Sequence, residues 1–101
     1  MDDASYYAFE QPVPITAELY GKIRERLGPE PLAGLVVHLS VRAPDGSIRY
    51  IDVWTSKEAC DRAFRERIHP AVQAVFAEEN FRPNGEPKRL PIDVIDVMRG
   101  T

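Results

Sequence analysis

The sequence predicts an α+β fold in which a four-stranded antiparallel sheet carries two helices on one face. Residues 35–54 form two apolar-rich runs around a Pro-Asp-Gly turn, which is typical of a β-hairpin. One helical pattern precedes this hairpin and another follows it. A strand-like segment comes before the first helix, and another comes after the second. With right-handed crossovers, this order of strand, helix, strand, strand, helix and strand gives the ferredoxin-like arrangement.

The length and composition of the chain narrow the classes of function. A chain of 101 residues is sufficient for one domain. The net charge of −3 argues against a nucleic-acid partner, because phosphate binding requires a basic surface. The N-terminal residues lack the pattern of a signal peptide and no apolar run is long enough to cross a membrane, so we expect a cytoplasmic protein without a membrane partner.

The single cysteine, Cys60, excludes an internal disulfide and a cysteine-based zinc site. It lies among small and apolar residues of a helical pattern, so we expect a buried and unreactive thiol. Two histidines and scattered acidic residues do not have the spacing of a metal site. We therefore expect neither a metal nor another cofactor.

The first strand is expected at residues 5–10 and ends at Pro12 and Pro14. A helix then begins after Thr16, whose hydroxyl can accept a free backbone N–H of the first turn. The helix ends at Gly28, which is followed by proline. Its apolar residues recur along one face: Leu19, Ile23 and Leu27.

The turn at residues 43–47 fixes the register of the central hairpin. It suits a type I turn with Pro44 at the second position and Gly46 in the left-handed conformation. The resulting pairs are Val36 with Trp54, Val37 with Val53, His38 with Asp52, Leu39 with Ile51 and Ser40 with Tyr50. A tighter loop would shift the register by one residue and pair apolar with polar side chains, so we favour the first register.

This register divides the hairpin into two unlike faces. One face is aliphatic and contains Val37, Leu39, Ile51 and Val53. The other face contains Val36, His38, Ser40, Tyr50, Asp52 and Trp54. We expect the two helices to cover the aliphatic face. The face with Tyr50 and Trp54 is too apolar to be left to water, so we expect a second copy of the chain to cover it.

The second helix is expected to begin after Ser56 and to continue to about Phe76, with a kink or break at His69-Pro70. Residues 80–91 contain three prolines, one glycine and no periodicity, which predicts a long loop of the kind that often covers a site. Alternating apolar residues then predict a last strand over residues 91–98.

Several segments carry a resemblance to known proteins: residues 34–38, 45–46 and 52–56, Phe64, and residues 67–70. They resemble the dimeric α+β barrel superfamily and, within it, the antibiotic-biosynthesis-monooxygenase-like family. The similarity extends over most of the chain and is strongest from residue 34 to residue 76. It implies a homodimer in which two sheets face each other and a ligand binds between a sheet and its helices or inside the barrel.

The same resemblance implies no single activity, because the superfamily includes cofactor-free monooxygenases of aromatic polyketides, haem-degrading enzymes, isomerases and cyclases. Haem-degrading members combine an asparagine on an early strand with a histidine on the second helix. Here His69 is on the helix, but Asn80 and Asn84 lie in the late loop. The sequence therefore argues against haem degradation.

The pair of His38 and Asp52 is the clearest candidate for chemistry. A carboxylate that accepts an imidazole N–H fixes the tautomer and leaves the other nitrogen free as a base. Tyr50, on the same face, can donate a hydrogen bond to a developing oxyanion. We predict His38 as the base, Asp52 as its orienting partner and Tyr50 as the oxyanion donor. The predicted substrate-binding residues are Ser40, Trp54, Phe64, His69 and Phe81.

Two classes of function remain open. In the first, a homodimer catalyses cofactor-independent oxygenation, isomerisation or cyclisation of a hydrophobic, aromatic small molecule. In the second, the dimer is not catalytic and binds a metabolite or has a structural role. In that case the His38–Asp52 pair only satisfies two polar groups at a subunit interface.

Overall fold

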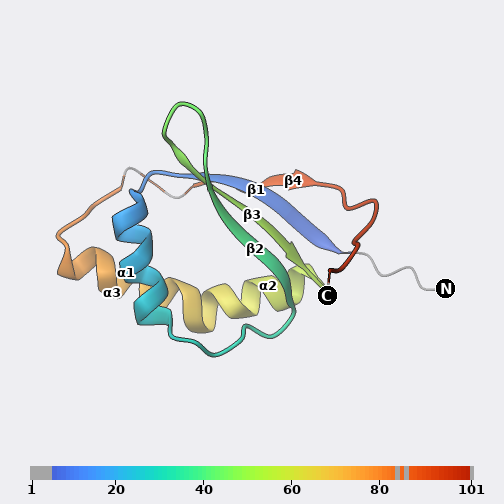
Figure 1. The fold of residues 1–101 in the computed structure, drawn as a ribbon. Coiled ribbons are helices and arrows are strands. Elements are labelled where there is room, and N and C mark those ends of the chain that lie inside the picture. The colour runs from blue at the N-terminus through green and yellow to red at the C-terminus, as the bar shows by residue number, and fades with distance from the viewer. Residues whose placement is uncertain (1–5, 84, 86, 101) are drawn as a thin grey trace.

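A computed structural model describes residues 6–83, 85 and 87–100. It contains a four-stranded antiparallel sheet of order β2-β3-β1-β4. Figure 1 shows the helices together on one side of this sheet, which is compatible with the predicted ferredoxin-like arrangement. The elements are β1 (Tyr7–Val13), α1 (Ala17–Leu27), β2 (Leu35–Arg42), β3 (Ile48–Trp54), α2 (Lys57–Ala63), the π-helical turn η1 (Phe64–Ile68), α3 (His69–Glu78) and β4 (Leu90–Ile92).

The hairpin of β2 and β3 has the predicted turn and register. The Ala43 N–H donates to the Ser47 carbonyl over 2.8 Å, and Gly46 has a φ of +91°. His38 pairs with Asp52 and Ser40 pairs with Tyr50, as expected. The register changes only at the start of β2, where an irregularity between Leu35 and Val37 places Leu35, not Val36, opposite Trp54.

The prediction of which face the helices cover is wrong. The helices cover the face of Phe9, Asp52 and Trp54, and leave the aliphatic face open, where Val37 is 40% exposed and Leu39 is 46% exposed. The physical reason is volume. Burying two large aromatic rings removes more apolar surface from water than burying valine and leucine, and small residues of α2 leave room for the rings: Cys60 and Ala63.

We call these surfaces the covered face and the open face. The covered face includes Phe9, His38, Tyr50, Asp52 and Trp54. The open face includes Val37, Leu39, Ile51 and Val53 from the hairpin, together with Leu90 and Ile92 of β4.

Two clusters of buried side chains hold the helices to the molecule. Phe9, Trp54, Cys60 and Ala63 join α2 to the sheet, whereas Leu19, Ile23 and Val75 join α1 to α3. Burial raises the pKa of the Cys60 thiol to about 12, so this thiol is protonated at neutral pH. The expectation that Cys60 is buried is confirmed, whereas its low reactivity stays a prediction that the raised pKa supports.

Both predicted helix caps are present. The Thr16 hydroxyl accepts the Leu19 N–H over 3.1 Å, and the Ser56 hydroxyl accepts the Ala59 N–H over 3.0 Å. The irregularity expected at His69-Pro70 takes the form of the π-helical turn, in which the His69 N–H donates to the Phe64 carbonyl. This turn places Pro70 in the first turn of α3, where its missing N–H costs little.

The two outer strands differ from their predicted lengths. β1 continues through Pro12, which is tolerated because β4 pairs with β1 only from Ala8 to Glu10 and leaves Pro12 at an edge. Residue 5, where this strand was expected to begin, lies outside the described residues. The last strand covers only Leu90–Ile92, which pair with Ala8–Glu10 of β1. Among the described residues, no helix has the length and apolarity needed to cross a membrane.

Candidate functional site

Three side chains from three elements form a hydrogen-bonded chain on the covered face. His38 is on β2, Asp52 is opposite it on β3, and Tyr20 is on α1. The His38 Nδ1 and the Asp52 Oδ1 are 2.5 Å apart, and the His38 Nε2 and the Tyr20 hydroxyl are 2.9 Å apart. The imidazole therefore connects a carboxylate to a phenol.

Asp52 is the buried end of this chain, with 2% of the residue exposed. Its second carboxylate oxygen, Oδ2, accepts the indole N–H of Trp54 over 3.0 Å. Both oxygens of Asp52 thus have a donor, which a carboxylate withdrawn from water requires. Trp54 holds the carboxylate in the orientation that meets His38.

The hydrogen-bonding roles of the imidazole follow from its partners. A carboxylate only accepts hydrogen bonds, so the Nδ1 of His38 carries a proton and donates it to Asp52. In the neutral imidazole, Nε2 then has a free lone pair and accepts the hydroxyl proton of Tyr20. This is the arrangement of a general base that is aligned by a carboxylate.

Two tyrosine rings contact the imidazole. The centroid of the Tyr50 ring is 4.9 Å from that of His38 in an edge geometry, and the Tyr20 ring is 6.0 Å away at an interplanar angle of 20°. Burial raises the pKa of both tyrosine hydroxyls, and the charge of Asp52 also raises both. Both hydroxyls therefore remain protonated at neutral pH and can donate hydrogen bonds.

The predicted catalytic residues His38, Asp52 and Tyr50 lie together, and Ser40 is an exposed neighbour on the same face of β2. Trp54 is fully buried, so the structure gives its ring no exposed surface on which a substrate can stack. Its contact with Asp52 replaces the predicted substrate contact.

The other predicted binding residues lie elsewhere. Phe64 packs in the cluster between α2 and the sheet. The guanidinium carbon of Arg89 lies 4.6 Å from the centroid of the Phe64 ring. His69 is exposed and meets the edge of the Phe64 ring. Phe81 packs against Phe76 in the cluster between α1 and α3. The structure does not bring His69 or Phe81 to His38.

Tyr20 is the residue of this site that sequence reasoning missed. It lies 18 positions before His38 on another element, so the strand register gives no indication of it. The available signal was its place on α1, beside the apolar stripe of Leu19 and Ile23. A tyrosine beside the buried stripe of a helix needs a partner for its hydroxyl.

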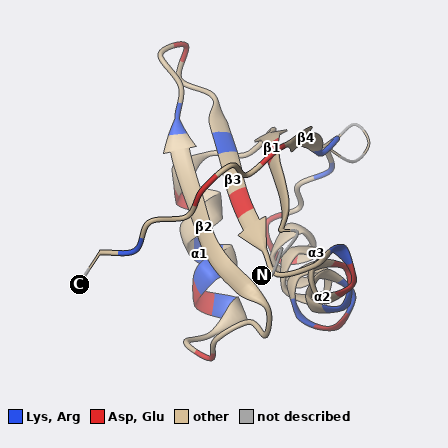
Figure 2. Cartoon of the chain, turned by 90° about the vertical axis from the view of Figure 1, so that its right-hand side faces the viewer, with Lys and Arg blue, Asp and Glu red and all other residues tan. Residues whose placement is uncertain are grey.

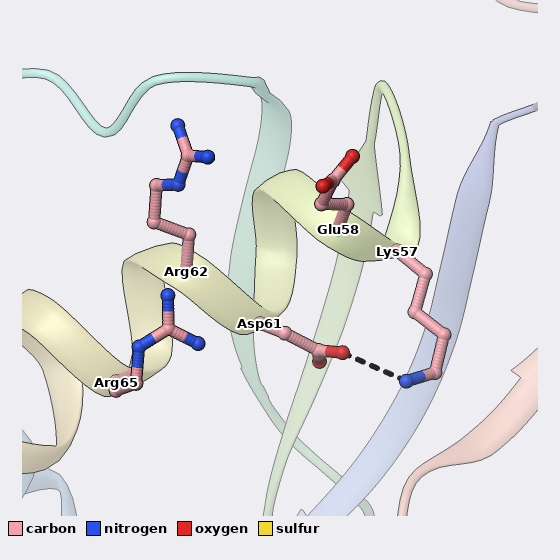
Figure 3. Close-up of a pocket in the computed structure, with 5 residues that line it drawn as sticks. All are labelled: Lys57, Glu58, Asp61, Arg62 and Arg65. Carbon is pink, nitrogen blue, oxygen red and sulfur yellow. Dashed lines mark hydrogen bonds and ion pairs between the residues drawn. The ribbon is translucent and has the colours of Figure 1, made fainter.

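A surface hollow along α2 and the start of η1 is lined by Lys57, Glu58, Asp61, Arg62 and Arg65 (Figure 3). Within it, Lys57 donates to Asp61 over 2.7 Å, and Asp61 also accepts from Arg89 over 3.0 Å. These contacts are those of an exposed, charged helix face. A second hollow, beside the late loop, is lined by Pro12, Val13, Pro14, Ser47, Ile48, Gly85 and Pro87. Neither hollow includes the chain of Asp52, His38 and Tyr20.

The fold and the site define an α+β protein in which a buried carboxylate, a partly exposed imidazole and a phenol are linked by hydrogen bonds. No family model and no curated protein matches this chain. Across the residues that the structure describes, no three His, Cys, Asp or Glu side chains gather as a metal site requires.

Proposed function

We propose that the protein abstracts a proton from a small aromatic molecule, as a cofactor-independent monooxygenase, isomerase or cyclase does in its first step. The single observation that carries this proposal is the continuous chain from Asp52 through His38 to Tyr20. The resemblance to the antibiotic-biosynthesis-monooxygenase-like family, stated above from the sequence, agrees with it.

The proposed proton transfer runs from the substrate to Tyr20 and from Tyr20 to His38. The hydroxyl oxygen of Tyr20 accepts the proton of a substrate phenol or enol, while the Tyr20 proton passes to Nε2 of His38. The products are a substrate anion and an imidazolium, and Asp52 stabilises the imidazolium charge. The substrate anion is the electron-rich species that precedes reaction with dioxygen, isomerisation or ring closure.

The surroundings of the hydrogen-bonded groups Asp52, His38 and Tyr20 suit a flat substrate. The His38 side chain is 25% exposed and Ser40 is exposed, so the covered face opens to solvent along β2. The rings of Tyr20 and Tyr50 offer aromatic surfaces for stacking or edge contacts. Ser40 supplies an exposed hydroxyl donor on this face, and Tyr50 supplies a second hydroxyl donor that is partly buried next to His38.

A second candidate, a non-catalytic protein, is favoured by the completeness of the hydrogen bonds. Asp52, His38, Tyr20 and the Trp54 indole satisfy one another without a ligand. A polar network of this kind can simply specify how α1 packs on the sheet. The two candidates differ in whether His38 changes the protonation of a bound molecule.

The proposal includes a homodimer. The second copy was expected on the face with Tyr50 and Trp54, but the helices already cover that face, so we place the second copy on the open face. Figure 2 shows β2 without charged residues along most of its length, whereas charges gather on the helices. The segment after β4 adds further exposed apolar residues, Ile95 and Met98. Such apolar surface is typical of an interface, and two-fold pairing of identical faces is the commonest solution.

The proposed activity is tested with 4-nitrophenol, whose phenolate absorbs visible light. We expect the bound probe to ionise more readily than the free probe, with the pKa of its hydroxyl lowered by about one, because Tyr20 and His38 accept its proton. His38→Gln and Tyr20→Phe should abolish this change. His69→Gln is the matched histidine control, since His69 lies away from the site, and should preserve it.

The opposite results decide between the candidates. If the bound probe has the same pKa in the wild-type protein and in His38→Gln, the non-catalytic candidate is correct. The mass of the native protein, measured by native mass spectrometry, tests the dimer separately. A monomer at micromolar concentration would contradict the proposed use of the open face.

A further inference from the structure

Helix α1 carries three basic residues, Lys22, Arg24 and Arg26, and they differ in their partners. Lys22 pairs with Glu79 over 3.0 Å, and Arg26 pairs with Glu78. These two exposed pairs connect α1 to the C-terminal end of α3. Arg24, by contrast, makes no ion pair with any residue that the structure describes.

Arg24 lies on the same side of α1 as Tyr20, four residues further along. Four residues correspond to about 6 Å along the axis of an α-helix. The guanidinium is close enough that its charge opposes the effect of burial on the pKa of the Tyr20 hydroxyl. Arg24 is itself exposed and is therefore open to a ligand.

We infer that Arg24 binds the carboxylate of an aromatic hydroxy acid whose hydroxyl group meets Tyr20 and His38. This inference rests on the proposed function and names the class of its substrate. The rise between the two positions on α1 is comparable to the length of one aromatic ring with substituents at opposite ends. The planar guanidinium also fits a carboxylate through two parallel hydrogen bonds.

The charge of the whole protein gives the arginine a specific role. With a net charge of −3, the chain as a whole does not attract an anion. The buried Asp52 adds a negative charge at the site, near the place where the substrate loses its proton. A positive group at the opposite end of the substrate offsets both effects and orients the ring, with its hydroxyl toward Tyr20.

Two chromogenic phenols test the inference by titration at one pH and low salt. The first probe, 4-nitrophenol, has no carboxylate, and the second, 4-hydroxy-3-nitrobenzoate, has one opposite its hydroxyl. We expect the wild-type protein to bind the second probe more tightly. In Arg24→Gln, the ratio of the two association constants should fall by about tenfold, as expected for the loss of a charged hydrogen bond.

Arg62→Gln is the matched control, because Arg62 is an exposed arginine on α2 in the hollow away from Tyr20, and it should keep the wild-type ratio. An equal ratio in the wild-type protein and Arg24→Gln would overturn the inference. The proposed function fails independently, if His38→Gln leaves the pKa of the bound 4-nitrophenol unchanged. Failure of the wild-type protein to bind either probe would overturn both.

Discussion

The two faces of one sheet show how differently a strand pair can use its side chains. The covered face holds a fully buried Trp54 and a buried carboxylate, Asp52. The open face holds Val37 and Leu39, which are exposed although they are aliphatic. Burial on this sheet therefore follows side-chain volume and the presence of hydrogen-bond partners, not the number of aliphatic residues.

The difference has a consequence for stability and function. On the covered face, polar groups are part of the core, so a change there affects the folding of the chain. On the open face, we expect a change to leave the fold of the single chain nearly intact and to affect only the proposed dimer. Substitutions on each face test this division.

The largest effect is expected for Asp52→Ala on the covered face. The substitution leaves the Trp54 indole N–H without its acceptor and removes the partner of His38 Nδ1. We expect the free energy of unfolding to fall by about 4 kcal/mol, measured by urea denaturation. Asp93→Ala is the control, because Asp93 is exposed after β4 and should change stability little. Similar losses in the two variants would contradict the role of Asp52.

The next effect compares two glycines with nearly the same backbone conformation. Gly34 has a φ of +87°, and a Cβ placed there would lie 2.5 Å from the Cβ of Ala59. Gly46 has a φ of +91° in the hairpin turn, and a Cβ there meets open space. We expect Gly34→Ala to cost about 3 kcal/mol and Gly46→Ala about 1 kcal/mol.

The free energy of unfolding of both variants is measured by thermal or urea denaturation. Comparing the two values separates the packing of the start of β2 against α2 from the backbone strain. The strain is common to the two positions, so the difference reports the contact with Ala59. Equal losses would show that Gly34 is not held against α2.

The hairpin register was predictable because local chemistry fixes it. Pro44 and Gly46 indicate the turn, and the matching of apolar and polar side chains across the two strands selects the register in which His38 faces Asp52. The side that the helices cover was not predictable in the same way. Both faces contain enough apolar surface to be buried, and the choice depends on α2, whose small Cys60 and Ala63 accommodate the large rings.

The candidate site was predicted only as far as the hairpin reaches. His38, Asp52 and Tyr50 follow from the register, because they share one face of two neighbouring strands. Tyr20 depends on how α1 crosses the sheet, which is a matter of tertiary packing. The last strand was predicted too long, because the alternation of residues 91–98 says nothing about whether a partner strand is available.

The smallest effect on the fold is expected for Leu39→Lys on the open face. Leu39 is 46% exposed in the single chain, so a lysine there can extend into water and the unfolding of the monomer should change by less than about 1 kcal/mol. In the proposed dimer the same lysine faces an identical lysine across the two-fold axis, or is buried without a partner. We therefore expect the dimer dissociation constant, measured by sedimentation, to rise at least about a hundredfold.

A variant that remains a dimer with unchanged affinity would show that the open face is not the interface. A variant that unfolds would show that this face belongs to the core of the single chain, and the distinction between the two faces would then be wrong.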